Sequence, residues 1–359
     1  MKILASDIGA GTEDILLYND RKQRMENCVK MVLPSPSQVY AARVGEATRL
    51  YQDLFVKGDT IGGGVLSSAF KKHVEKGLRL VMTEKAAYTI RNVLQEVKEL
   101  GVEVVSGENP PPDFDGETLK LQEVNFTQLA DFLTSVNEDL SDVEVVAVAV
   151  QDHGVFPQGT SNRRFRISTM KEILEENPRP EGLAFRGENV PSCFLRMESA
   201  VQAVKRQLPE TKVLVMDTAP AAILGCLKDP VINGTNSVLA INVGNGHTMA
   251  AIISEGNIVG VMEHHTRMLN PQSIEKFLVA FADGDLTNGE VFNDGGHGMF
   301  FLTQPPGFSE IERVAVTGPN RKMLAKTSLP VHFAIPAGDV MMTGPIGLVE
   351  ATKRKFKLG

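Results

Sequence analysis

Short apolar segments rich in β-branched residues alternate along the chain with longer segments of helical periodicity. The segments with the length and composition of strands are residues 2–6, 15–18, 79–83, 102–106 and 143–150. Between two of them, residues 84–100 carry apolar side chains at helical spacing and are followed by Gly101, a residue that commonly ends helices. This alternation of strands and helices predicts an α/β fold.

The same alternation continues to the end of the chain. Further helices are expected at residues 126–136, 197–208, 220–227 and 344–357, with strands at 212–217 and from about 236 onwards. We divide the chain at these elements into a first lobe of residues 1–218, a second lobe of residues 219–340 and a segment of residues 341–359 whose helix returns to the first lobe. Polar, arginine-rich residues 158–191 form either a lid inserted at a cleft or an ordinary solvated loop and helix.

One short pattern occurs twice. Residues 7–12, with the sequence DIGAGT, follow an apolar strand and precede a second strand and a turn. Residues 242–248, with the sequence NVGNGHT, stand in the same context in the second half of the chain. A repeat at this distance indicates two copies of one supersecondary unit.

A hairpin with glycines at alternate positions brings backbone N–H groups close to an anion, because no Cβ blocks the approach. The threonine hydroxyls add donors, and the Asp7 carboxylate is suited to hold the water shell of Mg²⁺. Two such hairpins facing each other would clamp the phosphates of a nucleotide between the lobes. The residues expected to bind phosphate are Asp7, Gly9, Ala10, Gly11, Thr12, Gly244, Asn245, Gly246, His247 and Thr248.

These two motifs resemble the first and second phosphate motifs of the actin, sugar-kinase and heat-shock-chaperone ATPase superfamily. Residues 213–227 and 338–351 resemble its two connecting helices, and residues 314–320 resemble its adenosine motif, which would place Gly318, Pro319 and Asn320 beside the purine and ribose. All five motifs occur in the order of the superfamily. A finer resemblance is to an archaeal and bacterial family that carries a pyruvate formate-lyase activating enzyme label.

The resemblance implies a two-lobed, ribonuclease H-like (actin-like ATPase) fold with duplicated mixed sheets and a nucleotide cleft between the lobes. It further implies ATP and Mg²⁺ as cofactors, and a Mg²⁺-dependent ATPase or small-molecule kinase. The chain departs from the superfamily at Asn242, where an aspartate is usual, at His247, and at Pro319, where a second glycine is usual. A Walker A loop, the competing phosphate motif, is absent from the sequence.

Further candidate residues follow predicted strands. Asp152 and His153 come directly after residues 143–150, where side chains line the crevice of an open α/β sheet. Asp152 is expected either to act as general base, with His153 orienting the substrate, or to cap the next turn. Asp217 competes for the water-activating or metal-binding role. Gly62, Gly63 and Gly64 precede a predicted helix and form either an anion or substrate site or a plain tight connection.

Four of the seven histidines, together with two acidic residues, fall in one stretch of the chain: His247, Glu263, His264, His265, Asp294 and His297. They are suited to bind a divalent transition metal or an anionic substrate, or they serve separate polar and capping roles. Adjacent histidines on a strand point to opposite faces, so His264 and His265 are not expected to bind one ion together.

Composition narrows the class of protein. The net charge of −7 gives no basic footprint for nucleic acid, and no apolar run approaches the roughly 20 residues of a membrane helix. The chain begins with a strand rather than a signal sequence, so a cytoplasmic location is expected. Cys28, Cys193 and Cys226 are far apart, which favours buried thiols and disfavours an iron–sulfur cluster and S-adenosylmethionine radical chemistry.

Three functions are compatible with these features. The first is an ATP-dependent enzyme acting on water or a small-molecule substrate. The second is an ATP-driven activator that remodels a partner enzyme. The third, favoured by Asn242 and the histidines, is a metal-dependent enzyme that has lost ATP binding.

Overall fold

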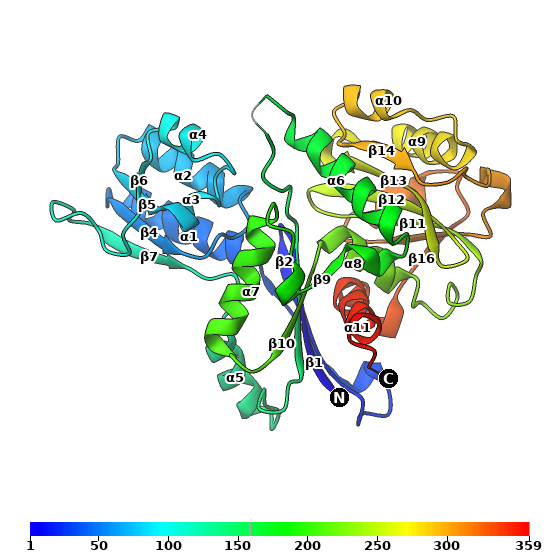
Figure 1. Cartoon of the computed structure of the whole chain (residues 1–359), viewed down its shortest axis with the longest axis horizontal. Helices are drawn as coiled ribbons and strands as arrows, with labels where there is room; N and C mark the ends of the chain where they lie inside the picture. The colour runs from blue at the N-terminus through cyan, green and yellow to red at the C-terminus, as the bar shows by residue number, and fades with distance from the viewer. Residues whose placement is uncertain (158, 359) are drawn as a thin grey trace.

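Two six-stranded sheets of mixed direction carry most of the chain (Figure 1). The structure, a computed structural model, describes residues 1–157 and 159–358; Gln158, the first residue of the predicted insertion, lies outside the described residues. The first sheet has the order β3-β2-β1-β8-β10-β9. Its strands are β1 Lys2–Ile8, β2 Thr12–Asn19, β3 Val29–Pro34, β8 Val145–Val150, β9 Ala184–Arg186 and β10 Lys212–Met216.

The second sheet repeats the central part of the first and differs at its edges. Its order is β14-β13-β12-β11-β15-β16, and its strands are β11 Ser237–Val243, β12 His247–Ser254, β13 Asn257–His265, β14 Gly298–Phe301, β15 Arg313–Thr317 and β16 Val331–Phe333. In both sheets the first three strands form an antiparallel meander, and the first of them pairs in parallel with a later strand on its other side. At the edges of the second sheet, β14 extends the antiparallel meander and β16 pairs in parallel. The mixed α/β prediction is confirmed.

A third sheet forms a separate layer, seen at the upper left of Figure 1. Its four parallel strands have the order β6-β5-β4-β7 and are β4 Leu54–Gly58, β5 Leu80–Thr83, β6 Glu103–Val105 and β7 Glu117–Leu121. The helices α1 Pro36–Arg49 and α2 Val65–Glu75 bury Val44, Leu66 and Phe70 in its own apolar core. The sequence predicted two of these strands but not a separate sheet.

The helix predicted over residues 84–100 is two short helices, α3 Glu84–Ala87 and α4 Leu94–Glu99. The residues between these helices are not helical, because the polar groups of Thr89 form hydrogen bonds with the segment that contains Ile61 and Ser67. The Thr89 hydroxyl accepts the N–H of Ile61 at 3.1 Å, and the Thr89 carbonyl accepts the Ser67 hydroxyl at 3.1 Å. This break lets the segment brace the glycine loop of residues 58–64.

The segment 158–191 contains a packed helix, α6 Asn162–Glu176. Its Ile167, Met170 and Leu174 are buried in one core cluster with residues of the second sheet. Neither interpretation from the sequence anticipated this packing, because the many charged residues of the helix conceal a narrow apolar face. Helices α5 Phe126–Ser135 and α7 Leu195–Gln207 lie at the first sheet, and α9 Pro271–Asp283 and α10 Asn288–Asn293 lie at the second.

Two helices meet at the centre of the molecule, α8 Thr218–Cys226 and α11 Thr343–Phe356 (Figure 1). A Cβ on Gly225 would overlap the Thr343 carbonyl, and one on Gly347 would overlap the Ala221 carbonyl, so the two backbones touch directly. Ile346, Leu348 and Val349 of α11 are buried with residues of the first sheet, as the predicted return of the C-terminal helix requires. Within the described residues, none of the helices has the length and apolar character needed to cross a bilayer.

Candidate functional site

The two glycine-rich motifs form hairpins of the same geometry. In the first, Gly9 N–H donates to the Thr12 carbonyl at 2.9 Å as β1 turns into β2. In the second, Gly244 N–H donates to the His247 carbonyl at 2.9 Å as β11 turns into β12. The tight loops therefore follow β1 and β11, which are interior strands of the two sheets.

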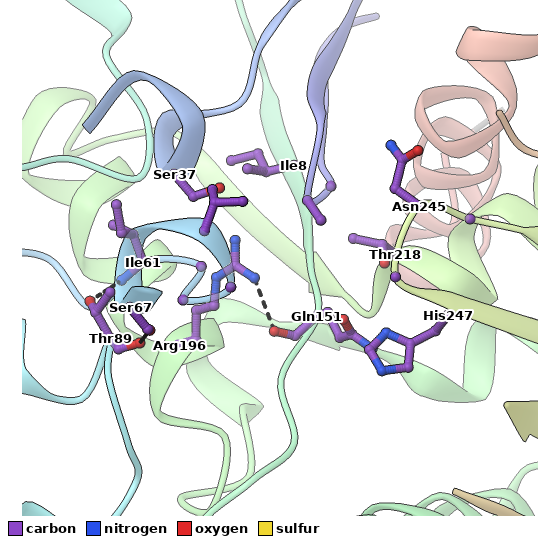
Figure 2. Close-up of a pocket in the computed structure, with 18 of the residues that line it drawn as sticks. Ile8, Ser37, Ile61, Ser67, Thr89, Gln151, Arg196, Thr218, Asn245 and His247 are labelled. Atoms are coloured by element: carbon purple, nitrogen blue, oxygen red, sulfur yellow. Dashed lines mark hydrogen bonds between the residues drawn. The ribbon is translucent and has the colours of Figure 1, made fainter. Parts of the chain in front are cut away.

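The two loops face each other across one pocket of about 1540 Å³. Asp7, Gly9, Ala10 and Thr12 line it from the first hairpin, and residues 244–247 line it from the second. The tips are close together, since a Cβ added to Gly11 would lie 2.6 Å from the Asn245 side-chain nitrogen. Figure 2 shows Asn245, Thr218 and His247 on one side of the pocket and Ile61, Ser67 and Thr89 on the other.

Gly318 and Pro319 line the same pocket beside the second hairpin. Gly318 has a φ of +94°, and a Cβ there would lie 2.5 Å from the Val243 carbonyl, so the position needs glycine. Asn320 does not line the pocket; its amide donates to the Gly244 carbonyl at 3.0 Å and supports the hairpin from behind.

Thr248 does not offer its hydroxyl to the pocket, contrary to the prediction. The side chain is buried, and its hydroxyl lies 3.0 Å from that of Thr266, which in turn donates to the Gly244 carbonyl at 2.8 Å. Successive residues of a strand alternate between faces, so His247 at the pocket turns Thr248 away from it. Thr248 therefore braces the hairpin.

Two carboxylates at the first hairpin lack partners. Asp7 Oδ1 and Asp14 Oδ1 are buried with no hydrogen-bond partner among the described residues. Burial raises the pKa of Asp7 well above its usual range, and the neighbouring carboxylates of Asp14 and Asp217 raise it further. Burial likewise raises the pKa of Asp14 to about 7. A divalent cation beside these oxygens would satisfy both, so the residues present fit Mg²⁺.

Asp217 is committed to a different partner. Its two oxygens accept from the Arg166 guanidinium at 2.7 and 3.0 Å, and Oδ1 also caps α8 at the N–H of Ala219. The same guanidinium donates to Glu263 of β13 at 2.7 and 2.8 Å. This buried trio joins the end of the first sheet to the second, and it leaves Asp217 without the free oxygen that metal binding or water activation requires.

Asp152 lines the pocket, but its carboxylate is occupied by three backbone N–H groups. Oδ1 accepts from Gly154 at 2.9 Å, and Oδ2 accepts from Arg196 at 2.7 Å and from Met197 at 3.1 Å. Burial nevertheless raises its pKa. Of the two roles that the sequence left open, this geometry favours the cap of the following turn and helix.

Gly62, Gly63 and Gly64 line the opposite wall, at the N-terminus of α2. A Cβ on Gly62 would lie 3.0 Å from the guanidinium of Arg196, which is held by Glu123 at 2.8 and 3.0 Å and by the Gln151 carbonyl (Figure 2). Basic side chains continue this wall, namely Lys71, Lys72, Lys76 and Arg91. Glu75 and Glu96 line the same wall, 3.7 Å from Lys71 and 3.8 Å from Arg91, so the excess positive charge of this wall is that of Lys72 and Lys76.

The histidines separate into two groups. His264 is buried, and its Nε2 lies 3.0 Å from Asp294, away from the others. The rings of His247, His265 and His297 lie 4.8 Å apart, centroid to centroid, and His153 joins them at 5.3 Å from His297. Pairing of His247 with His265 across β12 and β13 puts these two on one face of the sheet and His264 on the other.

The pKa values of the clustered histidines are all lowered, which favours their neutral form. Burial and the surrounding positive charges lower the pKa of His297 to about 3 and that of His265 to about 4, and they lower the pKa of His153 well below its usual range. Burial also lowers the pKa of His247. The predicted set thus loses His264 and Asp294 and gains His153, which the sequence had assigned to substrate orientation.

The sequence did not reveal two buried arginines, Arg166 and Arg196. A signal for Arg166 exists, because it shares the spacing of Met170 and Leu174 on the apolar face of α6, where a charge must find partners. No comparable pattern marks Arg196.

The family described provisionally as a pyruvate formate-lyase activating enzyme (DUF1786) matches residues 61–323. No curated protein matches the chain.

Among solved structures, the ROK hexokinase of Thermus thermophilus is 12% identical with a TM-score of 0.25; the match covers 72% of this chain and 47% of the hexokinase, so the chain spans about half its length. A Bacteroides thetaiotaomicron protein with an actin-like ATPase fold is 9% identical, with coverage of 96% and 95% and a TM-score of 0.36. The Lmo2764 protein of Listeria monocytogenes, provisionally an N-acetylmannosamine kinase, is 10% identical, with coverage of 99% and 100% and a TM-score of 0.37. Because these scores are low, the description of the fold depends on the strand order of the chain itself.

Proposed function

The chain belongs to the DUF1786 family, and we propose that it binds Mg²⁺–ATP in the pocket between its two six-stranded sheets and transfers the γ-phosphoryl group to water or to a small molecule. The observation that carries the proposal is the pair of glycine hairpins, one from each sheet, whose tips meet across this pocket. The meander of three strands with a parallel strand beside it, present in both sheets, supports a duplicated actin-like ATPase fold whose lobes are residues 1–218 and 219–340.

Phosphate would be held mainly by backbone amides. The N–H groups of Gly9 and Gly244 close the two hairpins, so the donors would be the N–H groups at the tips, those of Ala10, Asn245 and Gly246, which line the pocket. The neighbouring glycines carry no Cβ that would keep an anion from them. Such fixed donors stabilise the charge that develops on a transferring phosphoryl group without having to reorganise. The basic side chains of the facing wall add favourable charge for a polyanion.

Asp7 and Asp14 would hold the Mg²⁺, which neutralises charge on the β- and γ-phosphates when bound. Asn242 stands at the equivalent place in the second hairpin and contributes no charge there. The metal would therefore be held from the first sheet alone. Asp217 is left out of this assignment because Arg166 occupies it.

The purine would lie toward Gly318 and Pro319, and the acceptor toward the glycine loop and α2. An acceptor with negative charge fits this wall better than a neutral one, because Lys72 and Lys76 line it beside the ion pairs of Lys71 and Arg91. The cytoplasmic location stays a prediction.

The radical chemistry suggested by the family description does not enter the proposal. Such chemistry needs three thiolates on one iron–sulfur cluster. Cys28 and Cys226 are buried in different core clusters, and Cys193 packs against a third. Burial also raises the pKa of Cys226, which keeps this thiol protonated. Activation of a partner enzyme by ATP hydrolysis remains the alternative for which a partner would have to be found.

The test is calorimetric titration of the full chain with Mg²⁺–ATP, comparing the wild type with Asp7→Asn and with Asp131→Asn, an exposed control on α5. We expect binding by the wild type and the control, and at least a tenfold weaker affinity in Asp7→Asn, as in typical losses of a charged contact. Equal affinity in all three proteins would remove Asp7 from the site. No binding by the wild type would refute the proposal.

Turnover then separates the activities. Phosphate release without an acceptor indicates an ATPase, phosphorylation of an added metabolite indicates a kinase, and release stimulated by a captured protein indicates an activator.

A further inference from the structure

The histidine cluster beside the second hairpin contains ring nitrogens that the described residues do not satisfy. His247 Nε2 and His297 Nδ1 are buried and have no hydrogen-bond partner there. His297 itself is almost completely buried. An unpaired polar atom in the interior is costly, and each one in a native fold calls for an explanation.

The geometry points to a transition-metal site formed by His153, His247 and His297, with room for a further ligand from the pocket. One ring nitrogen from each residue lies within 4.8 Å of the others. His153 Nε2 and His297 Nε2 are 3.2 Å apart, close to the roughly 3.4 Å that separates two nitrogens bound tetrahedrally to zinc at about 2.0–2.1 Å. A small movement of His247 would complete the set.

The surroundings of the cluster suit a cation bound by neutral imidazoles. The buried trio behind it has one positive charge, on Arg166, and two negative charges, on Asp217 and Glu263, so its net charge is −1. Glu263 Oε2 lies 3.7 Å from His297 Nδ1, on the side of the ring away from His153. This distance is longer than a hydrogen bond, and a closer approach of Glu263 would fix the ring and strengthen the ligand, as carboxylates behind ligating histidines do.

His247 has a comparable support. The Gln151 amide lies 2.8 Å from His247 Nδ1, which leaves Nε2 for the ion. The atom at this position is the amide nitrogen; turning the amide over would place its oxygen there, so that it accepts a hydrogen bond from Nδ1–H and holds the ring in the metal-binding tautomer. Figure 2 shows the Gln151 side chain against the His247 ring.

Imidazole nitrogens select ions of the Zn²⁺, Co²⁺, Fe²⁺ and Ni²⁺ class over Mg²⁺, which prefers oxygen. The site is thus chemically distinct from the carboxylates of Asp7 and Asp14. His153 and His247 line the pocket while His297 does not, so the position that the protein leaves open faces the pocket. Three neutral ligands leave the charge of the ion available, and the open position would take an anionic oxygen of a ligand bound in the pocket.

The experiment uses full-length protein without a histidine tag, stripped with EDTA and titrated with Zn²⁺ and Co²⁺ by calorimetry, with elemental analysis of the product. We expect one ion per chain for the wild type. His153→Ala, His247→Ala and His297→Ala should each weaken binding by about a hundredfold or more, above the loss typical of an outer-shell change. His332→Ala, a histidine bound to Asp229 outside the cluster, is the matched control.

The absorption spectrum of the Co²⁺ protein tests the site without any variant. Intense visible bands of a four- or five-coordinate ion, shifted by added inorganic phosphate, would support the nitrogen site and its open position; weak bands of an octahedral oxygen site would overturn it. Absence of Zn²⁺ and Co²⁺ binding at micromolar concentration, or equal losses in His332→Ala and His247→Ala, would also overturn it.

The outcome is separable from that of the proposed function. Asp7→Asn is expected to lose Mg²⁺–ATP and to keep Zn²⁺, whereas His247→Ala is expected to lose Zn²⁺.

Discussion

Arg166 offers the most direct test of how the two large sheets are held together. Its guanidinium donates two hydrogen bonds to Asp217 and two to Glu263, at 2.7–3.0 Å, and all three side chains are buried. Arg166→Met removes the guanidinium that the two carboxylates share while keeping the apolar length of the side chain. Removing one member of a buried ion pair costs about 3–5 kcal/mol, because the remaining charge stays desolvated.

We therefore expect Arg166→Met to lower the free energy of unfolding at neutral pH by about 3–5 kcal/mol, measured by denaturant unfolding followed by circular dichroism. The triple variant Arg166→Met, Asp217→Asn, Glu263→Gln should recover most of the loss, because no buried charge is left and Asn still caps α8. A loss in Arg166→Met below about 1 kcal/mol, the range of an exposed ion pair, would refute the reasoning. Failure of the triple variant to recover would show that the hydrogen bonds lost by the buried polar groups, rather than uncompensated charge, account for the loss.

Three further substitutions test the stability of the fold and the affinity for nucleotide. Burial lowers the pKa of His73, so folding excludes its proton and stability should fall as pH drops below the ordinary histidine pKa of about 6.5, by at most about 1.4 kcal/mol per pH unit; His73→Gln should flatten this slope in unfolding curves. Gly11→Ala adds a Cβ 2.6 Å from the Asn245 nitrogen, so it should weaken nucleotide binding by calorimetry, and Asn245→Ala should restore it. Thr248→Val should cost about 1 kcal/mol of stability through the lost bond to Thr266 and leave nucleotide affinity unchanged; a large affinity loss would return Thr248 to the binding site.

The sequence was most informative where a local pattern determines local structure. The two glycine motifs lie at strand ends because strand periodicity and glycine spacing are both short-range signals, and the hairpins formed at the predicted residues. The buried strand β8 and the terminal helix α11 were likewise readable from their composition. Even the separation of His264 from His265 follows from the two-residue period of a strand.

What could not be read depends on contacts between distant segments. Residues 54–121 form a sheet of their own through pairing that no local pattern specifies. Thr89 leaves a helical pattern because Ile61 and Ser67 use its polar groups. His153 meets His297 only because two sheets approach each other, and the distance along the chain between them conceals the cluster.

The crossing of α8 and α11 has a mechanical consequence. Main chain meets main chain at Gly225 and Gly347, so no side chain stands between the helices to resist a small turn. α8 follows β10 of the first sheet and α11 follows β16 of the second, so the crossing lies where a rotation of one sheet against the other would have its axis. Hinge motions of this kind keep strands intact while the far ends travel most. Opening and closing of the pocket would then be one rotation, with its axis at two glycines outside the candidate site. A larger residue at either glycine would block this rotation by separating the helices.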